Sequence, residues 1–217
     1  MERPRASAAR FDAGLFAADA EHSWTLPADW YVDPAIYAAE RTAIFDRSWI
    51  YQCHRSQVAG PGQRHAGTIA GRPVVVACDG DGSLRAFEAD RHDAPARPLR
   101  LEDYGGLLFV NRDAQAAPLV SRAGKLLADM RATCPQLEDL VFAHRHEVTV
   151  AANWKTVIDN NHECYHCATN HPTLMQLVGY EGKARWSDDG ITFSHAVEVN
   201  TLDNGAYALS ADALAQQ

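Results

Sequence analysis

The stretch RPVVVACDGDGSLRAF, residues 72–87, constrains the fold of this chain more than any other segment. A β-branched run from Arg72 to Cys78 is followed by the turn sequence DGDG and then by SLRAF. Asp-Gly pairs favour the tight turns of β-hairpins, because glycine readily takes the positive φ angles that those turns need. The stretch therefore predicts two antiparallel strands, and with them a fold that contains an antiparallel sheet.

Other segments extend this prediction to a mixture of helices and strands. Asp33-Pro34 is typical of a helix start, and apolar residues follow it at helical spacing. Strands are expected within the runs GLLFVN (106–111), HEVTVAANW (146–154) and ITFSHAVEV (191–199). We expect residues 121–132 to form a helix that ends at Cys134-Pro135, and residues 88–103 to form a loop. The predicted fold class is therefore α+β.

Composition excludes several classes of protein. The 217 residues are 47% hydrophobic and 22% charged, which is ordinary for a folded domain. The formal net charge is −8 and the basic residues are scattered, so a nucleic-acid surface is not expected. No apolar run approaches the eighteen residues that a membrane helix needs, so no membrane partner is expected. The five cysteines favour reduced thiols in a cytoplasmic protein over a disulfide framework.

The richest chemistry lies in NNHECYHCATNHP, residues 160–172. His166 and His171 are five residues apart, which on an unbroken helix would rotate them by roughly 140° from each other. Pro172 disfavours helical dihedral angles at His171, so we expect the helix to end between the two histidines and to let their imidazoles meet. Glu163 stands about one helical turn before His166. Two histidines and a carboxylate are the ligand set of non-haem Fe(II) oxygenases.

Other interpretations of these residues stay open. Cys164-x-x-Cys167 is also typical of a redox pair or of half a zinc site, and a small zinc protein would use both cysteines with two histidines. The sequence has no second Cys-x-x-Cys and no βαβ pattern before this one, which disfavours both readings. Single histidines such as His144, His146 and His195 are more typical of surface or core positions than of metal ligands.

The longer segment NWKTVIDNNHECYHCATNHP, residues 153–172, resembles the iron-site signature of Rieske-type non-haem iron oxygenase α subunits, the aromatic ring-hydroxylating dioxygenase family. The resemblance implies that His166 and His171 bind a mononuclear Fe(II). It implies that Glu163 is the carboxylate that bridges toward the Rieske cluster of a neighbouring subunit, and that Asn160 and Tyr165 are flanking motif residues of the catalytic site. The form with Glu163 and two cysteines is most similar to members that oxidise choline, glycine betaine, stachydrine or carnitine.

The resemblance covers about residues 30–200 and implies three parts. Residues 1–45 would form an N-terminal arm and helix, and residues 46–115 a Rieske-like antiparallel β unit. Residues 116–217 would form the first part of a helix-grip-like catalytic domain. Members of the family use Fe(II), O₂ and electrons from NAD(P)H, delivered by a ferredoxin or flavin reductase, to hydroxylate or demethylate a small organic substrate. Their α subunits assemble head to tail as trimers.

The sequence departs from this family at two places. A Rieske [2Fe–2S] cluster needs two cysteines and two histidines, yet no cysteine lies between Cys78 and Cys134, and this stretch offers only His92. We therefore predict that the cluster is absent and that this chain has no ligands for it. The family's third iron ligand is an Asp far beyond the histidines, and it is expected to be missing as well. The chain would then be inactive alone, or a non-catalytic metal-binding remnant or partner of a full-length α subunit in a mixed assembly.

Overall fold

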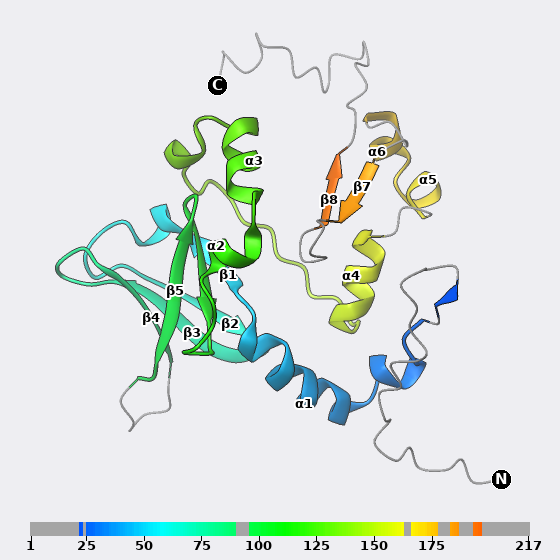
Figure 1. The fold of residues 1–217 in the computed structure, drawn as a ribbon, viewed down its shortest axis with the longest axis horizontal. Coiled ribbons are helices and arrows are strands. Elements are labelled where there is room, and N and C mark those ends of the chain that lie inside the picture. The colour runs from blue at the N-terminus through cyan, green and yellow to red at the C-terminus, as the bar shows by residue number, and fades with distance from the viewer. Residues whose placement is uncertain are drawn as a thin grey trace.

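The computed structural model describes residues 22–23, 25–89, 96–162, 166–177, 183–186 and 193–196. Its main feature is a six-stranded sheet in the order β1-β6-β5-β4-β3-β2, in which every pair of neighbours is antiparallel (Figure 1). The strands are β1 (Ile50–His54), β2 (Arg64–Ile69), β3 (Arg72–Cys78), β4 (Leu84–Glu88), β5 (Pro98–Tyr104) and β6 (Leu107–Asn111).

The predicted hairpin is confirmed as β3 and β4. Cys78 is paired with Leu84 at the turn end, and Val74 with Glu88 at the open end. The turn is closed by the Asp79 N–H, which donates to Ser83 O at 2.8 Å, and by the Gly82 N–H, which donates to Asp79 O at 3.0 Å. Gly82 has a φ of 85°, a value that a side chain would strain. GLLFVN is likewise confirmed as β6.

Strand β5 corrects the sequence prediction, which treated residues 88–103 as a loop. Within β5 (Pro98–Tyr104), residues 100–104 pair with β6, and Pro98 and Leu99 pair with β4. Leu99 and Leu101 pack against the core. They are the only two apolar positions that show the alternation expected of a strand, so the signal in the sequence was weak. The prolines nearby obscured it. Pro98 is tolerated because it is the first residue of the strand.

The core lies against one face of the curled sheet. The first and last strands in the sheet order, β1 and β2, also contact each other, which gives the sheet a barrel-like curl. Gly67 on β2 permits this approach, because a Cβ there would collide with Gln52 Oε1 on β1. Burying each large apolar side chain contributes roughly 1.5–3 kcal/mol. The fully buried cluster consists of Cys53, Val58, Ile69, Val74, Val76, Ala86, Leu108 and Val110.

Helices flank the sheet. Helix α1 (Pro34–Ala43) begins as predicted, because the Asp33 side chain accepts a hydrogen bond from Ala35 N at 2.8 Å. The single helix expected over residues 121–132 is divided into α2 (Leu119–Ala123) and α3 (Leu126–Thr133). Gly124, with a φ of 54°, separates them, while Cys134 ends α3 as predicted. Short 3₁₀ helices are η3 (Ala28–Tyr31), η4 (Phe45–Arg47), η5 (Arg55–Val58) and η6 (Leu137–Asp139).

The strand predicted over residues 146–154 is wrong. Residues 140–150 form neither helix nor strand, and Val148 and Val150 are 69% and 58% exposed. The segment does lie near the sheet, since Phe142 N donates to Ser56 Oγ at 2.9 Å, but it makes no ladder with a described strand, and alternation alone does not form a strand without such pairing. Three helices follow, α4 (Trp154–His162), α5 (Cys167–Asn170) and α6 (Pro172–Leu177).

The last described elements are two short strands, β7 (Lys183–Trp186) and β8 (Phe193–Ala196), which pair antiparallel. Strand β8 lies within the predicted ITFSHAVEV strand, and the remainder of that prediction falls outside the described residues. Among the described helices, none is long and apolar enough to cross a membrane. The mixture of helices and antiparallel sheet confirms the α+β class.

Candidate metal centre

Helix α4, which begins the predicted metal-binding region, is fixed to α1 by a buried polar cluster. Glu40 of α1 accepts from Lys155 Nζ at 2.6 Å and from Trp154 Nε1 at 2.8 Å. The Trp154 ring also meets Phe45 edge to face, with centroids 5.2 Å apart. The two ends of the cluster lie 115 residues apart in the sequence, so the sequence pattern gave no sign of this contact. The start of α4 is therefore set by residues of the N-terminal helix.

Tyr31 extends this anchorage along α4. Its hydroxyl donates to Asp159 Oδ2 at 2.8 Å, and its carbonyl accepts from Asn153 Nδ2 at 3.0 Å. The Lys155 ammonium lies 5.3 Å from the Tyr31 ring centroid, within the range of a cation–π contact. Burial, followed by the hydrogen bond to Asp159, raises the pKa of the Tyr31 hydroxyl. Asp159 is thus engaged by Tyr31, which joins the middle of α4 to η3.

The two predicted metal ligands lie next to each other. The ring centroids of His166 and His171 are 5.2 Å apart, and their planes meet at 78°. The predicted break between them is confirmed: α5 ends at Asn170, and His171 takes φ −127° and ψ 56°, outside the helical region. Pro172 is the first residue of α6, a position where the backbone N–H that proline lacks would have no partner within the helix. His166 is half-buried and His171 is exposed.

The other predicted site residues do not complete this pair within the described structure. Asn160 is an exposed residue of α4. Glu163 and Tyr165 lie outside the described residues, so their roles stay predictions. Within the ranges that the structure describes, no group of three His, Cys, Asp or Glu side chains is gathered as a metal site.

Cys167 lies next to His166, one of the two predicted metal ligands. It is 5% exposed, and its Sγ lies 4.0 Å from His166 Nε2. It is disulfide-bonded, so the expectation of reduced cysteines is wrong at this residue, whereas Cys53, Cys78 and Cys134 are free thiols. Zinc is bound by thiolates, and a sulfur held in a disulfide is not one. The zinc interpretation therefore requires this bond to be reduced first.

A sheet rich in antiparallel pairs, followed by a helical segment that presents two neighbouring imidazoles, defines a candidate metalloprotein of the α+β class. Comparison with known proteins makes the class specific. Residues 137–214 match the family model described as ring hydroxylating alpha subunit (catalytic domain). The chain is a homologue of the α subunits of Rieske-type oxygenases, as its iron-site motif predicted.

The relatives are oxygenase subunits. The carnitine monooxygenase oxygenase subunit of Escherichia coli K12 is 29% identical, and the match takes in 75% of this chain and 56% of that protein. The glycine betaine monooxygenase oxygenase subunit of Chromohalobacter salexigens is 25% identical, with 74% and 46% covered. The chain thus spans about half the length of the curated relatives it matches.

Solved structures agree on the fold. A quaternary ammonium Rieske monooxygenase superposes with a TM-score of 0.69 at 24% identity, over 76% of this chain and 59% of that one. A naphthalene 1,2-dioxygenase superposes with a TM-score of 0.55 at 18% identity, over 67% and 44%. The alignment with the Escherichia coli protein runs over 210 positions but uses 75% of the 217 residues here, so parts of that relative have no counterpart in this chain.

Proposed function

We propose that this chain provides the mononuclear iron region of a Rieske-type oxygenase, with His166 and His171 as iron ligands. The observation that carries the proposal is the 5.2 Å separation of the two imidazole centroids. With metal–nitrogen distances of roughly 2.0–2.1 Å, two imidazoles on one ion at tetrahedral or octahedral angles place their centroids roughly 4.5–5.5 Å apart. The spacing of the pair therefore fits a shared divalent ion.

The donor chemistry also fits iron. Neutral imidazoles suit Fe(II), and a carboxylate is the third member of the usual facial set. In the proposed site Glu163 is the carboxylate nearest to His166 in the sequence, and it would either bind the iron or connect it to the neighbouring subunit. Asn160 and Tyr165 would be flanking catalytic residues. Bound iron would supply the activation of O₂. The protein's own contribution is to hold the two imidazoles together, through the turn at His171 and the anchorage of α4 on Glu40.

The substrate is proposed to be a small quaternary ammonium compound that is hydroxylated or demethylated. The support is the activity for which the relatives are named, since they are carnitine and glycine betaine monooxygenase oxygenase subunits. One structural relative is described in terms of carnitine oxidation and inter-subunit electron transfer. We accordingly propose a trimer or a mixed assembly in which electrons arrive from a reductase by way of a neighbouring subunit.

A specific observation favours a second candidate function, that of a metal-binding partner that does not turn over alone. No cysteine lies between Cys78 and Cys134, so the two thiolates of a Rieske cluster cannot come from the segment that carries them in the family. Such a chain would accept electrons only from an intact neighbour. The division into an arm, a Rieske-like β unit and a partial catalytic domain, with the bounds predicted above, belongs to the same proposal.

Metal analysis of purified variants tests the iron site. Replacing His166 or His171 by Ala should remove stoichiometric Fe(II) binding, because one imidazole alone holds the ion too weakly. Cys167→Ala should retain most of the iron, whereas a zinc site would lose its main affinity with that thiolate. His146→Ala is the matched control, since it removes an exposed histidine outside the site. Iron that persists in both histidine variants would overturn the proposal.

A further inference from the structure

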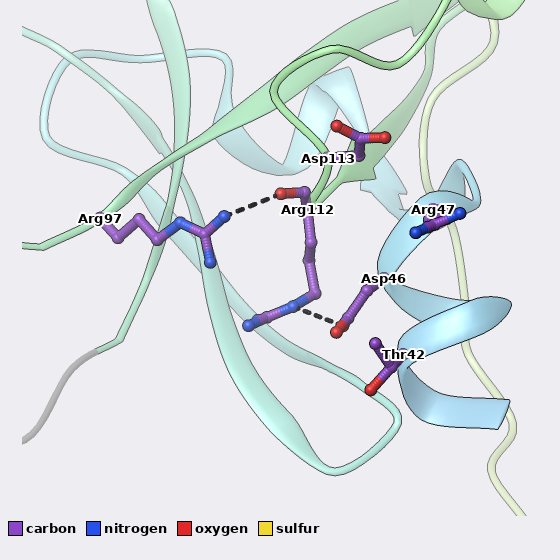
Figure 2. A pocket seen from close by; sticks show the side chains of 6 residues that line it. All are labelled: Thr42, Asp46, Arg47, Arg97, Arg112 and Asp113. Atoms are coloured by element: carbon purple, nitrogen blue, oxygen red, sulfur yellow. Dashed lines mark hydrogen bonds and ion pairs between the residues drawn. The ribbon is translucent and has the colours of Figure 1, made fainter. Parts of the chain in front are cut away.

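A pocket of about 230 Å³ lies on the sheet part of the molecule and is rich in arginine. No residue of α4, α5 or α6 lines it, so it is separate from the proposed iron site. The lining comes from α1 and η4, from the segment that leads into β5, and from the end of β6 (Figure 2). Its lining residues are Thr42, Asp46, Arg47, Arg97, Arg112 and Asp113.

Arg112 is the buried centre of this pocket. Its side chain is 7% exposed, with Nε 2.8 Å from Asp46 Oδ1 and Nη2 2.6 Å from Glu88 Oε1. Its Nη1 is buried and has no hydrogen-bond partner among the described residues, and the Nε contact is an ion pair rather than a well-directed hydrogen bond. Buried donors are nearly always paired in native proteins, so this donor is left for a partner that the described residues do not supply.

The remaining charges leave an excess of positive charge. Arg47 is exposed, and its side chain makes no ion pair with a described residue, while Arg97 is shared between Glu88 Oε1 at 3.2 Å and Arg112 O at 3.1 Å. Asp113 Oδ1 already accepts from Gln115 N at 2.8 Å. Among the described residues, the lining holds three arginines and two aspartates, a formal charge of +1. Glu88 and Arg72, which pair with Arg112 and Asp46, cancel each other.

We propose that this pocket binds a small oxyanion, a phosphate or carboxylate group. Guanidinium groups present a planar fork of N–H donors that matches the oxygens of both anions. Arg112 Nη1 would donate from the floor, Arg47 would close the site from the exposed side, and the Thr42 hydroxyl adds a donor from α1. The volume of about 230 Å³ is below the roughly 300–1,000 Å³ of pockets for drug-sized ligands, which favours a small anionic group.

Calorimetric titration of the full chain with inorganic phosphate and with acetate, in a chloride buffer of constant ionic strength, tests this proposal. We expect saturable binding of at least one of them at a single site, and the tighter of the two identifies the anion class. Arg47→Gln should weaken binding about tenfold, because it removes a charged donor from an anion contact. It should not unfold the chain, because this arginine is exposed.

Arg85→Gln provides the matched control. It removes the same charge from the β3–β4 hairpin, where Arg85 is 50% exposed and paired with Asp79, and it should leave the anion affinity unchanged. Arg112→Lys should abolish binding, because lysine lacks the planar fork of guanidinium N–H donors. If Arg112→Lys does not fold, the result for Arg47→Gln decides the question. The absence of saturable binding in the unmodified chain, or an equal loss in Arg47→Gln and Arg85→Gln, would overturn the proposal.

Discussion

Lys155 Nζ lies 2.6 Å from Glu40 Oε1, and the two side chains are 8% and 10% exposed. This ion pair joins α1 to the first turn of α4, and the Trp154 indole donates to the second oxygen of the same carboxylate. Both oxygens of Glu40 are thus occupied, which is the condition under which a buried carboxylate is tolerated. The helix that precedes the two histidines depends on this contact for its position.

Breaking this pair should destabilise the protein strongly. Lys155→Met removes the cation and leaves Glu40 buried without compensation, so we expect a loss of about 3–5 kcal/mol in the free energy of unfolding. Urea denaturation measures it. Lys125→Met is the control, because Lys125 is 85% exposed in its ion pair with Asp129, and it should cost less than about 0.5 kcal/mol. Similar losses in the two variants would contradict the role given to Glu40.

Gly106 should tolerate no side chain. It has a φ of 91°, and a Cβ at this position would collide with the Nε2 of buried His54. Gly106→Ala is therefore expected to lower the melting temperature clearly, with a cost of about 1–3 kcal/mol from the backbone alone. Gly80 lies in the β3–β4 turn, with open space around it and no positive φ. Gly80→Ala should therefore leave the melting temperature nearly unchanged. A neutral Gly106→Ala would mean that β6 shifts to make room.

Cys53 should make stability fall at high pH. Burial raises the pKa of its thiol from an ordinary 9.0 to about 11, against a smaller lowering by Arg145. The stabilisation that goes with a raised pKa is fully present below the pKa of the thiol in the unfolded chain, and it is lost as pH rises through the pKa in the folded chain. For Cys53 the contribution is therefore lost between about pH 9 and 11.

The measurement is the free energy of unfolding at about pH 8 and about pH 10.5. The unmodified chain should lose more stability over this interval than Cys53→Ala, by at most about 1.4 kcal/mol per pH unit. The variant removes the titrating thiol and leaves the other ionisable groups in place, so the difference isolates Cys53. Equal slopes would show that this thiol is not the group responsible.

The purified chain should contain no acid-labile sulfide and show no visible bands of a [2Fe–2S] centre. The reason is the absence of cysteine between Cys78 and Cys134, where the family carries its cluster ligands. A full-length oxygenase subunit purified in the same way serves as the positive control. Stoichiometric sulfide would mean that the free cysteines Cys53 and Cys78, which are buried, had been recruited instead.

Local signals in the sequence predicted the parts of the fold that are stabilised locally. The Asp-Gly turn gave the β3–β4 hairpin, Asp33-Pro34 gave the start of α1, and Pro172 gave the break at His171. Elements that depend on partners were predicted less well. Strand β5 exists because β4 and β6 lie on its two sides, whereas residues 146–154 make no ladder with a described strand.

The candidate site shows the same division. Pro172 predicted that the helix breaks between His166 and His171 and that their rings meet, because this contact is short in sequence. Their role as iron ligands was implied by the family resemblance. The anchorage through Glu40 and the cluster around Arg112 was missed, because single charged residues far apart in sequence carry no pattern. Glu163 and Tyr165 belong to the motif but lie outside the described structure, so their geometry stays a prediction.

The contact between Glu40 and Lys155 also sets an order of events during synthesis. Its partners are 115 residues apart, and domains are synthesised from the N-terminus at about 5–20 residues per second. Glu40 and the whole six-stranded sheet, which ends at Asn111, are therefore synthesised before Lys155. Until that lysine is made, the Glu40 carboxylate lacks the cation that neutralises it in the folded protein. The segment that carries the two histidines can therefore be anchored to α1 only after every strand of the six-stranded sheet has been synthesised.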